Sequence, residues 1–192
     1  MRPRHLDDLI PLSRRALASA LARAQETEPL PLAVDATAGN GHDTLFLASA
    51  IGERGHVWAF DVQEAALASA RARVEAAGFA SRVSFALSGH ETLSAALPED
   101  ASGRVWAAAF NLGFLPGSDK TVTTRAENTL AALKSLAVLT APGGVLSVHA
   151  YAGHKGGEDE LRAVNAWFAG LGWDVWRVAG YSFINKIRNR ET

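Results

Sequence analysis

The sequence contains no cysteine, a single methionine and no long apolar run. Without cysteine there can be no disulfide, no thiolate metal ligand and no cysteine nucleophile. No apolar stretch approaches the roughly 20 residues that a membrane span requires. The first residues, MRPRHLDDLIPLSRR, lack the apolar core of a signal peptide. These absences predict a cytoplasmic protein.

An excess of charge of one sign is also missing, because 19 Lys and Arg residues face 20 Asp and Glu residues, for a formal net charge of -1. Contact with RNA would therefore depend on local patches. Two clusters at the chain ends could follow phosphates or could simply be solvated: Arg2, Arg4, Arg14 and Arg15, and Lys186, Arg188 and Arg190. A length of 192 residues suits one domain, 1–192, on which a helical segment, 1–28, packs.

Strand-like and helix-like segments alternate along the chain. Apolar, β-branched runs predict strands at 30–37, 55–61, 81–87, 104–113, 144–151 and 173–183. Helical spacing predicts helices at 6–26, 42–52, 62–78, 89–97, 124–144 and 158–171. This order predicts an α/β fold with a doubly wound, mostly parallel sheet covered on both faces.

Ligands of such sheets bind beyond the carboxyl ends of the strands, where this chain gathers unusual polar and glycine residues. The first such loop has Gly39 and Gly41 around Asn40, but Thr44 stands where a dinucleotide fingerprint needs its third glycine. Asp61 follows about 20 residues after Gly41, where a carboxylate can bind ribose hydroxyls. S-adenosylmethionine, which has no phosphates, therefore fits better than a dinucleotide. The alternative is that Asp35 and Asp61 are only turn or capping residues.

The stretches DATAGNGHDTLFLA, FNLGFLPGSDKTVTT, YAGHKGG and FIN resemble the YtqB-like family of class I methyltransferases over nearly the whole chain. The resemblance implies a cytoplasmic enzyme, a possible homodimer, that uses S-adenosylmethionine to methylate the 5-aminomethyl group of a wobble (2-thio)uridine in tRNA. Two departures stand out: Thr37 replaces a glycine of the general class I loop, and only KIRNRET follows FIN, where the family continues into a last antiparallel strand. We therefore expect a class I sheet without that strand.

Candidate site residues follow from strand ends and from the resemblance. Asn111 could accept an amine N–H through its carboxamide oxygen, and Asp119 could take the amine proton or lie only at a helix entrance. The cofactor set is Asp35, Thr37, Ala38, Gly39, Asn40, Gly41, His42, Asp43, Asp61, Gln63, His90 and Asn111. The substrate set is Gly113, Leu115, Lys120, Tyr151, His154 and Asn185.

Several of these residues have ordinary alternatives. Asp43 could complement the dipole of its helix, and His90 could be a lone exposed histidine. His149 is expected to be a satisfied interior residue, and no carboxylate at ligand spacing supports a zinc site around it, so we predict no metal. Two rival functions remain open: methylation of a small free amine, and a non-catalytic module that retains a nucleotide site.

Overall fold

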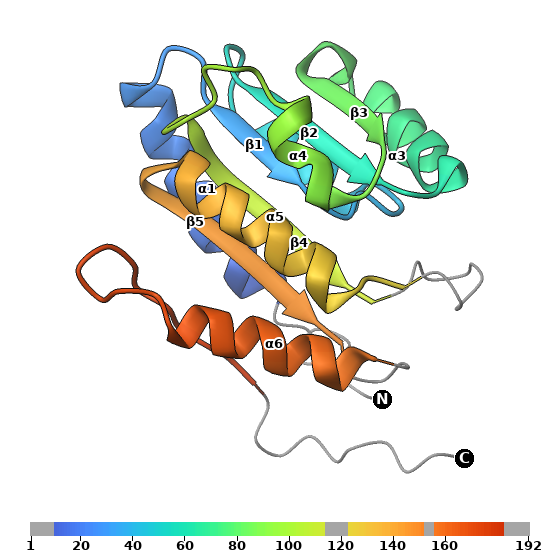
Figure 1. The fold of residues 1–192 in the computed structure, drawn as a ribbon. Helices are drawn as coiled ribbons and strands as arrows, with labels where there is room; N and C mark the ends of the chain where they lie inside the picture. The colour runs from blue at the N-terminus through green and yellow to red at the C-terminus, as the bar shows by residue number, and fades with distance from the viewer. Residues whose placement is uncertain (1–9, 114–122, 152–155, 183–192) are drawn as a thin grey trace, which may run out of the picture.

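The computed structural model describes residues 10–113, 123–151 and 156–182. Five parallel strands form one sheet in the order β3-β2-β1-β4-β5 (Figure 1). The strands are β1 (Leu32–Asp35), β2 (His56–Asp61), β3 (Val83–Leu87), β4 (Val105–Leu112) and β5 (Thr140–Ala150). The helices are α1 (Ile10–Thr27), α2 (His42–Ala50), α3 (Glu64–Ala76), α4 (Leu93–Ala96), α5 (Ala126–Leu139) and α6 (Gly157–Ala169). The α/β doubly wound fold is confirmed.

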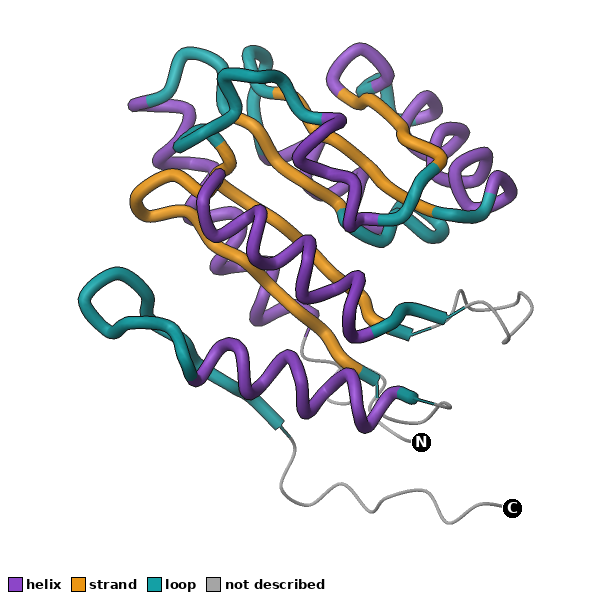
Figure 2. Tube along the Cα trace, in the orientation of Figure 1, coloured by secondary structure: helices purple, strands orange, loops and turns teal. Residues whose placement is uncertain are grey.

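Helices cover both faces of this sheet (Figures 1 and 2). Leu17 and Leu21 of α1 pack with Leu47 of α2 and Val74 of α3 in a core on one face. On the other face, Leu133 of α5 packs with Val164 of α6 and with Phe60 and Phe110 of the sheet. Strands between two helical layers must be apolar on both sides, which explains why β1 and nearly all of β4 are buried.

The residues that join α5 to the sheet differ from the prediction. The helix ends at Leu139, and β5 begins at Thr140 instead of Gly144. Pairing with β4 shifts register, because Val105 lies opposite Thr140 whereas Ala107 lies opposite Val145. The extra β5 residues include Gly143 at a φ of 85°, a conformation that favours glycine. The predicted Pro-Gly-Gly helix stop is instead a bulge inside the strand.

The predicted sixth strand, 173–183, is wrong over its described part. Residues 173–182 form a turn followed by irregular chain, and most of their side chains are exposed. A strand requires a neighbour for its N–H and C=O groups, and the described part of the chain offers this segment none. In the sheet formed by the described residues, β5 is consequently an edge strand, and most of its residues are only half-buried.

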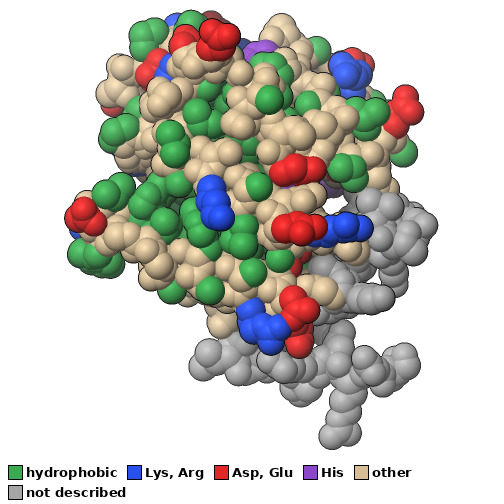
Figure 3. All heavy atoms as spheres, in the orientation of Figure 1, with side chains coloured by type: hydrophobic (Ala, Val, Ile, Leu, Met, Phe, Trp, Pro, Cys, Tyr) green, Lys and Arg blue, Asp and Glu red, His purple; other side chains and the backbone are tan. Residues whose placement is uncertain are grey.

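Apolar side chains remain exposed beside this edge. They include Val138 at the end of α5 and Trp173, Val175 and Val178 in the irregular segment. Figure 3 shows hydrophobic side chains gathered on this side of the molecule, around the ends of α5 and α6. Within the part of the chain that the structure describes, no helix is long and apolar enough to cross a membrane.

Candidate functional site

The site is built where neighbouring strands lead to opposite faces of the sheet. β1 and β4 are adjacent and parallel, with Asp35 opposite Ala109. The chain leaves β1 toward α2 on one face, whereas β4 is followed by α5 on the other. Connections that diverge in this way leave a crevice at the carboxyl ends of the two strands, which is the usual ligand position of a doubly wound sheet.

The loop between β1 and α2 requires its two glycines. Gly39 and Gly41 have φ values of 50° and 76°. A Cβ on Gly41 would lie 2.5 Å from the Cα of Ala70 in α3, so any side chain there would clash with backbone. Backbone bonds hold the loop further, since Ala38 N–H donates to the Phe60 carbonyl and Arg73 Nε donates to the Asn40 carbonyl over 2.7 Å. The loop is therefore pre-formed before any ligand arrives.

Asp35 organises this loop from within the protein. Its side chain is 0% exposed, and its carboxylate accepts bonds from Thr44 Oγ1 at 2.5 Å and from Thr37 N–H at 3.2 Å. Burial is the main reason that the pKa of Asp35 rises to about 7, and the charges of Asp43 and Asp61 raise it further. Thr44, the residue in the place of a third fingerprint glycine, thus serves as the partner of a buried acid.

Thr37 ties the same loop to β4. Its hydroxyl accepts the backbone N–H of Asn111 over 2.7 Å, which links the end of β1 directly to the end of β4. A glycine at this position has no side chain to make the bond. The departure from the general class I loop therefore has a structural role in this chain.

Asp61, at the end of β2, has the geometry that a ribose site requires. Its Oδ2 accepts Gly39 N–H and its Oδ1 accepts Gln63 N–H, both at 2.9 Å. Each carboxylate oxygen has a second lone pair for a further donor. The side chain is half-buried beside the glycine loop, so a ligand with two adjacent hydroxyl groups fits these residues.

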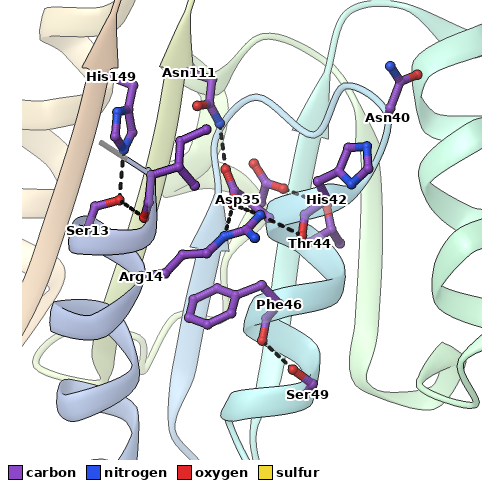
Figure 4. A network of polar contacts seen from close by, with 12 residues as sticks. Ser13, Arg14, Asp35, Asn40, His42, Thr44, Phe46, Ser49, Asn111 and His149 are labelled. Atoms are coloured by element: carbon purple, nitrogen blue, oxygen red, sulfur yellow. Dashed lines mark hydrogen bonds and ion pairs between the residues drawn. The ribbon is translucent and has the colours of Figure 1, made fainter. Parts of the chain in front are cut away.

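A network of polar contacts joins Asn111 at the end of β4 to α2 and α1, and Figure 4 shows two of its members, Asn111 and Arg14. Asn111 Nδ2 donates to Asp43 Oδ2 over 2.7 Å. Arg14 of α1 donates to Asp43 Oδ1 from Nε at 3.0 Å and from Nη2 at 2.7 Å, and its guanidinium lies over the ring of Phe46. Asp43 is therefore more than a complement to the helix dipole. Arg14, which sequence reasoning treated only as part of a terminal cluster, is brought into the site by the packing of α1.

The two histidines of the cofactor set differ in environment. His42 is exposed at the start of α2. Its pKa is lowered, mainly by partial desolvation and to a smaller extent by the positive charges of Arg73 and Arg14. His90 is buried rather than exposed, so that alternative was wrong. Its Nδ1 lies 3.1 Å from the Ala36 carbonyl and its Nε2 lies 3.3 Å from Thr129 Oγ1. Desolvation by burial lowers its pKa.

The substrate set is only partly within the described residues. Tyr151 is 52% exposed at the end of β5, and Gly113 accepts the Thr124 backbone N–H through its carbonyl. His149 is half-buried and its Nε2 lies 2.8 Å from Ser13 Oγ. Four predicted substrate residues and one catalytic residue lie outside the described part: Leu115, Lys120, His154 and Asn185, and Asp119. Among the described residues, no three His, Asp or Glu side chains are grouped so that they could hold a metal ion.

Known proteins that resemble the chain identify its family. The model of a family described as "Putative rRNA methylase" matches residues 57–192. The chain belongs to this family. The assignment drawn from the sequence motifs is confirmed, and the family is one of methyltransferases.

Two solved structures in particular resemble the chain over most of its length. The first, described as a putative rRNA-methylase, is from Clostridium thermocellum and is 32% identical, with a TM-score of 0.78 over 90% of this chain and 91% of that chain. The second, a putative methyltransferase from Streptococcus mutans in complex with SAH, is 34% identical, with a TM-score of 0.80 over 94% and 92%. The fold is therefore the Rossmann-like fold of class I methyltransferases.

A curated relative provides a more specific comparison. The chloroplastic tRNA (mnm(5)s(2)U34)-methyltransferase of Arabidopsis thaliana is 36% identical over 161 residues, which is 80% of this chain. The chain spans 58% of the length of that protein.

Proposed function

We propose that this methylase-family protein transfers a methyl group from S-adenosylmethionine to an amine, the 5-aminomethyl group of a wobble (2-thio)uridine in tRNA. The observation that carries the proposal is the bond from Asn111 to Asp43 at the crevice between β1 and β4. It places an amide with a defined orientation beside a loop that suits the cofactor. The Arabidopsis relative, named for a tRNA wobble position, supports the choice of substrate.

The described residues fit S-adenosylmethionine in their chemistry. Asp61 has free lone pairs for two ribose hydroxyls, and the tight turn at Gly39 and Gly41 lets a ligand approach the backbone. Thr37, Ala38, Asn40 and Gln63 surround this turn, and His42 and Asp43 begin the next helix. When bound, S-adenosylmethionine supplies an electrophilic methyl group on a sulfonium. Asp35, being fully buried, contributes by shaping the loop.

Asn111 would hold the acceptor amine. Its Nδ2 is committed to the Asp43 carboxylate, so Oδ1 is the atom left to accept an amine N–H. Such a bond directs the nitrogen lone pair away from Asn111 and fixes the in-line approach that methyl transfer requires. The amine must be unprotonated to react, and we assign its proton to Asp119 or to solvent. Contact with the substrate stays assigned to the set expected from the sequence: Gly113, Leu115, Lys120, Tyr151, His154 and Asn185.

The first experiment is calorimetric titration of the purified protein with S-adenosylmethionine, with NADH as the control ligand. We expect binding of S-adenosylmethionine alone, followed by methylation of undermethylated tRNA. Methylation of a free 5-aminomethyl nucleoside at an equal rate, without sensitivity of tRNA binding to salt, would favour the small-amine rival. Cofactor binding with no methylation of either acceptor would favour the non-catalytic module.

The expected oligomeric state and the expected cellular location can each be measured directly. A homodimer is predicted from the family resemblance, and sedimentation at micromolar concentration tests it. A cytoplasmic location is predicted from the sequence, and fractionation of cells that express the natural protein tests it.

A further inference from the structure

A largely buried chain of polar side chains runs from Thr124 to His90, which lies beside the cofactor loop. Its centre is Glu160 of α6, which is only 2% exposed to solvent. Glu160 Oε2 accepts Thr124 Oγ1 over 2.6 Å, and its Oε1 accepts Thr129 Oγ1 over 2.7 Å. Thr129, in α5, is fully buried and lies 3.3 Å from His90 Nε2. The chain ends where His90 Nδ1 meets the Ala36 carbonyl.

The contact between His90 Nδ1 and the Ala36 carbonyl defines the tautomer and the orientation of the imidazole ring. A backbone carbonyl can only accept, so Nδ1 of His90 carries the hydrogen that bonds Ala36. The ring also packs edge-on against Phe110, with centroids 5.6 Å apart. Nε2 is thereby directed at the hydroxyl oxygen of Thr129, 3.3 Å away. Thr129 donates its single hydroxyl hydrogen to Glu160, so the contact between Nε2 and Oγ1 is a hydrogen bond only when Nε2 also carries a hydrogen, and is a van der Waals contact in the neutral ring. Glu160 therefore restrains Thr129 by a hydrogen bond, and Thr129 restrains the ring of His90 by direct contact.

The two ends of this chain reach the two loops of the proposed reaction. Ala36 is the first residue after β1, and its carbonyl precedes the turn that carries Gly39. Thr124, at the other end, donates its backbone N–H to Gly113, two residues after Asn111. A single buried carboxylate is therefore linked to the cofactor side through Thr129 and His90, and to the acceptor side through Thr124.

We propose that Glu160 is a positioning residue that sets the cofactor loop through Thr129 and His90 and the acceptor side through Thr124. This inference rests on the proposed function and deepens it, because it assigns separate tasks to the two hydroxyl groups. Loss of the Thr129 hydroxyl acts on cofactor affinity. Loss of the Thr124 hydroxyl acts on turnover and on KM for the acceptor.

The test compares Thr129→Val with Thr129→Ser and with Thr124→Val. For Thr129→Val we expect the Kd for S-adenosylhomocysteine to rise about 10-fold, the effect of one lost buried hydrogen bond. Thr129→Ser keeps the hydroxyl and should restore affinity to within about twofold. Thr124→Val should leave Kd within about twofold while it lowers kcat/KM for tRNA about 10-fold. Glu160→Gln should both raise the Kd and lower kcat/KM for tRNA. Glu158→Gln, at an exposed site on the same helix, should change neither quantity.

A second readout does not depend on ligand or substrate. The ring ¹⁵N resonances of His90 in the ligand-free protein should shift in Thr129→Val and Glu160→Gln and stay unchanged in Glu158→Gln. Thermal melting of each variant identifies any variant that fails to fold.

The outcomes separate the two proposals. If the wild-type protein binds no cofactor and methylates no acceptor, the proposed function fails, while the His90 resonances still show whether the chain of bonds exists. If the wild type is active but Thr129→Val and Glu160→Gln retain its cofactor affinity, the positioning role is overturned. Equal losses of affinity and turnover in Thr124→Val and Thr129→Val would also overturn it, because the two hydroxyl groups would then have no separate tasks.

Discussion

Asn111 and Asp43 are joined side chain to side chain at 2.7 Å, which connects the end of β4 with the first turn of α2 across 68 positions of sequence. The bond gives both residues a defined orientation. The carboxylate identifies the donating atom of Asn111 as Nδ2, because a carboxylate cannot donate. Among the described residues Oδ1 has no hydrogen-bond partner, and the proposed acceptor site is built on this atom.

Asn111→Ala should separate chemistry from cofactor binding. Removal of the amide leaves the acceptor amine without its oriented partner, so we expect kcat to fall about 100-fold. The Kd for S-adenosylmethionine should change less than about threefold, because Asp61 and the glycine loop remain. Calorimetry and single-turnover methylation of tRNA measure the two quantities. A parallel loss of both would contradict the role given to Asn111.

Asp61→Ala should act on cofactor binding. The carboxylate bonds Gly39 and Gln63 and is assigned to the ribose, and charge-assisted bonds of this kind contribute about 1.5–3 kcal/mol each. We therefore expect the Kd to rise about 10- to 100-fold. Glu75→Ala, an exposed substitution on α3, is the matched control. An unchanged Kd in Asp61→Ala would refute the ribose assignment.

Arg14→Leu tests the cation that sequence reasoning did not place in the site. Arg14 donates twice to Asp43, and its side chain is 34% exposed, so the contribution of the pair is reduced by solvent. We expect a loss of about 1 kcal/mol in the free energy of unfolding, measured by urea denaturation. Arg15→Leu, the exposed neighbour, should change it by less than about 0.5 kcal/mol. Equal effects would show that Arg14 makes no specific contribution.

Asp35→Asn should change how stability depends on pH. The pKa of Asp35 is raised from 3.8 to about 7, chiefly by burial, so the folded protein keeps a proton that the unfolded chain releases. The free energy of unfolding of the wild type should therefore fall, relative to Asp35→Asn, as pH rises from about 4 to 7, by on the order of 4 kcal/mol in total. Urea titrations at pH 4, 5, 6, 7 and 8 measure this difference, with the exposed Glu53→Gln as control. Parallel profiles for wild type and Asp35→Asn would contradict the raised pKa.

Limited trypsin digestion tests the segment after α6. Arg177 lies in exposed, irregular chain, whereas Arg162, which is also exposed, lies within α6. Proteases cut extended, unpaired backbone fastest, so cleavage after Arg177 should precede cleavage after Arg162. Mass spectrometry of early fragments gives the order. Protection of Arg177 equal to that of Arg162 would indicate that 173–182 is held in regular structure.

Sequence patterning identified most of the fold because its signals are local. The apolar runs that became β1, β2, β3 and β4 are bounded by turn residues, and Gly39 and Gly41 have positive φ values, which favour glycine over other residues. The pattern failed at 173–182, where a β-branched and aromatic run has strand propensity but no partner in the described part of the chain. It failed also at Pro142 and Gly143, which lie in a bulge of β5 rather than after a helix.

The sequence by itself determined the doubly wound class, the glycine loop and the positions of Asp61 and Asn111 at strand ends, because periodicity and turn chemistry act between near neighbours. Only the tertiary structure decided that Asp35 is buried with Thr44, that Arg14 reaches Asp43, and that Glu160 connects with His90 through Thr129. The last two of these contacts join residues from different helices and loops, far apart in the chain. Their geometry depends on how α1, α5 and α6 pack on the sheet, which no local pattern of residues records.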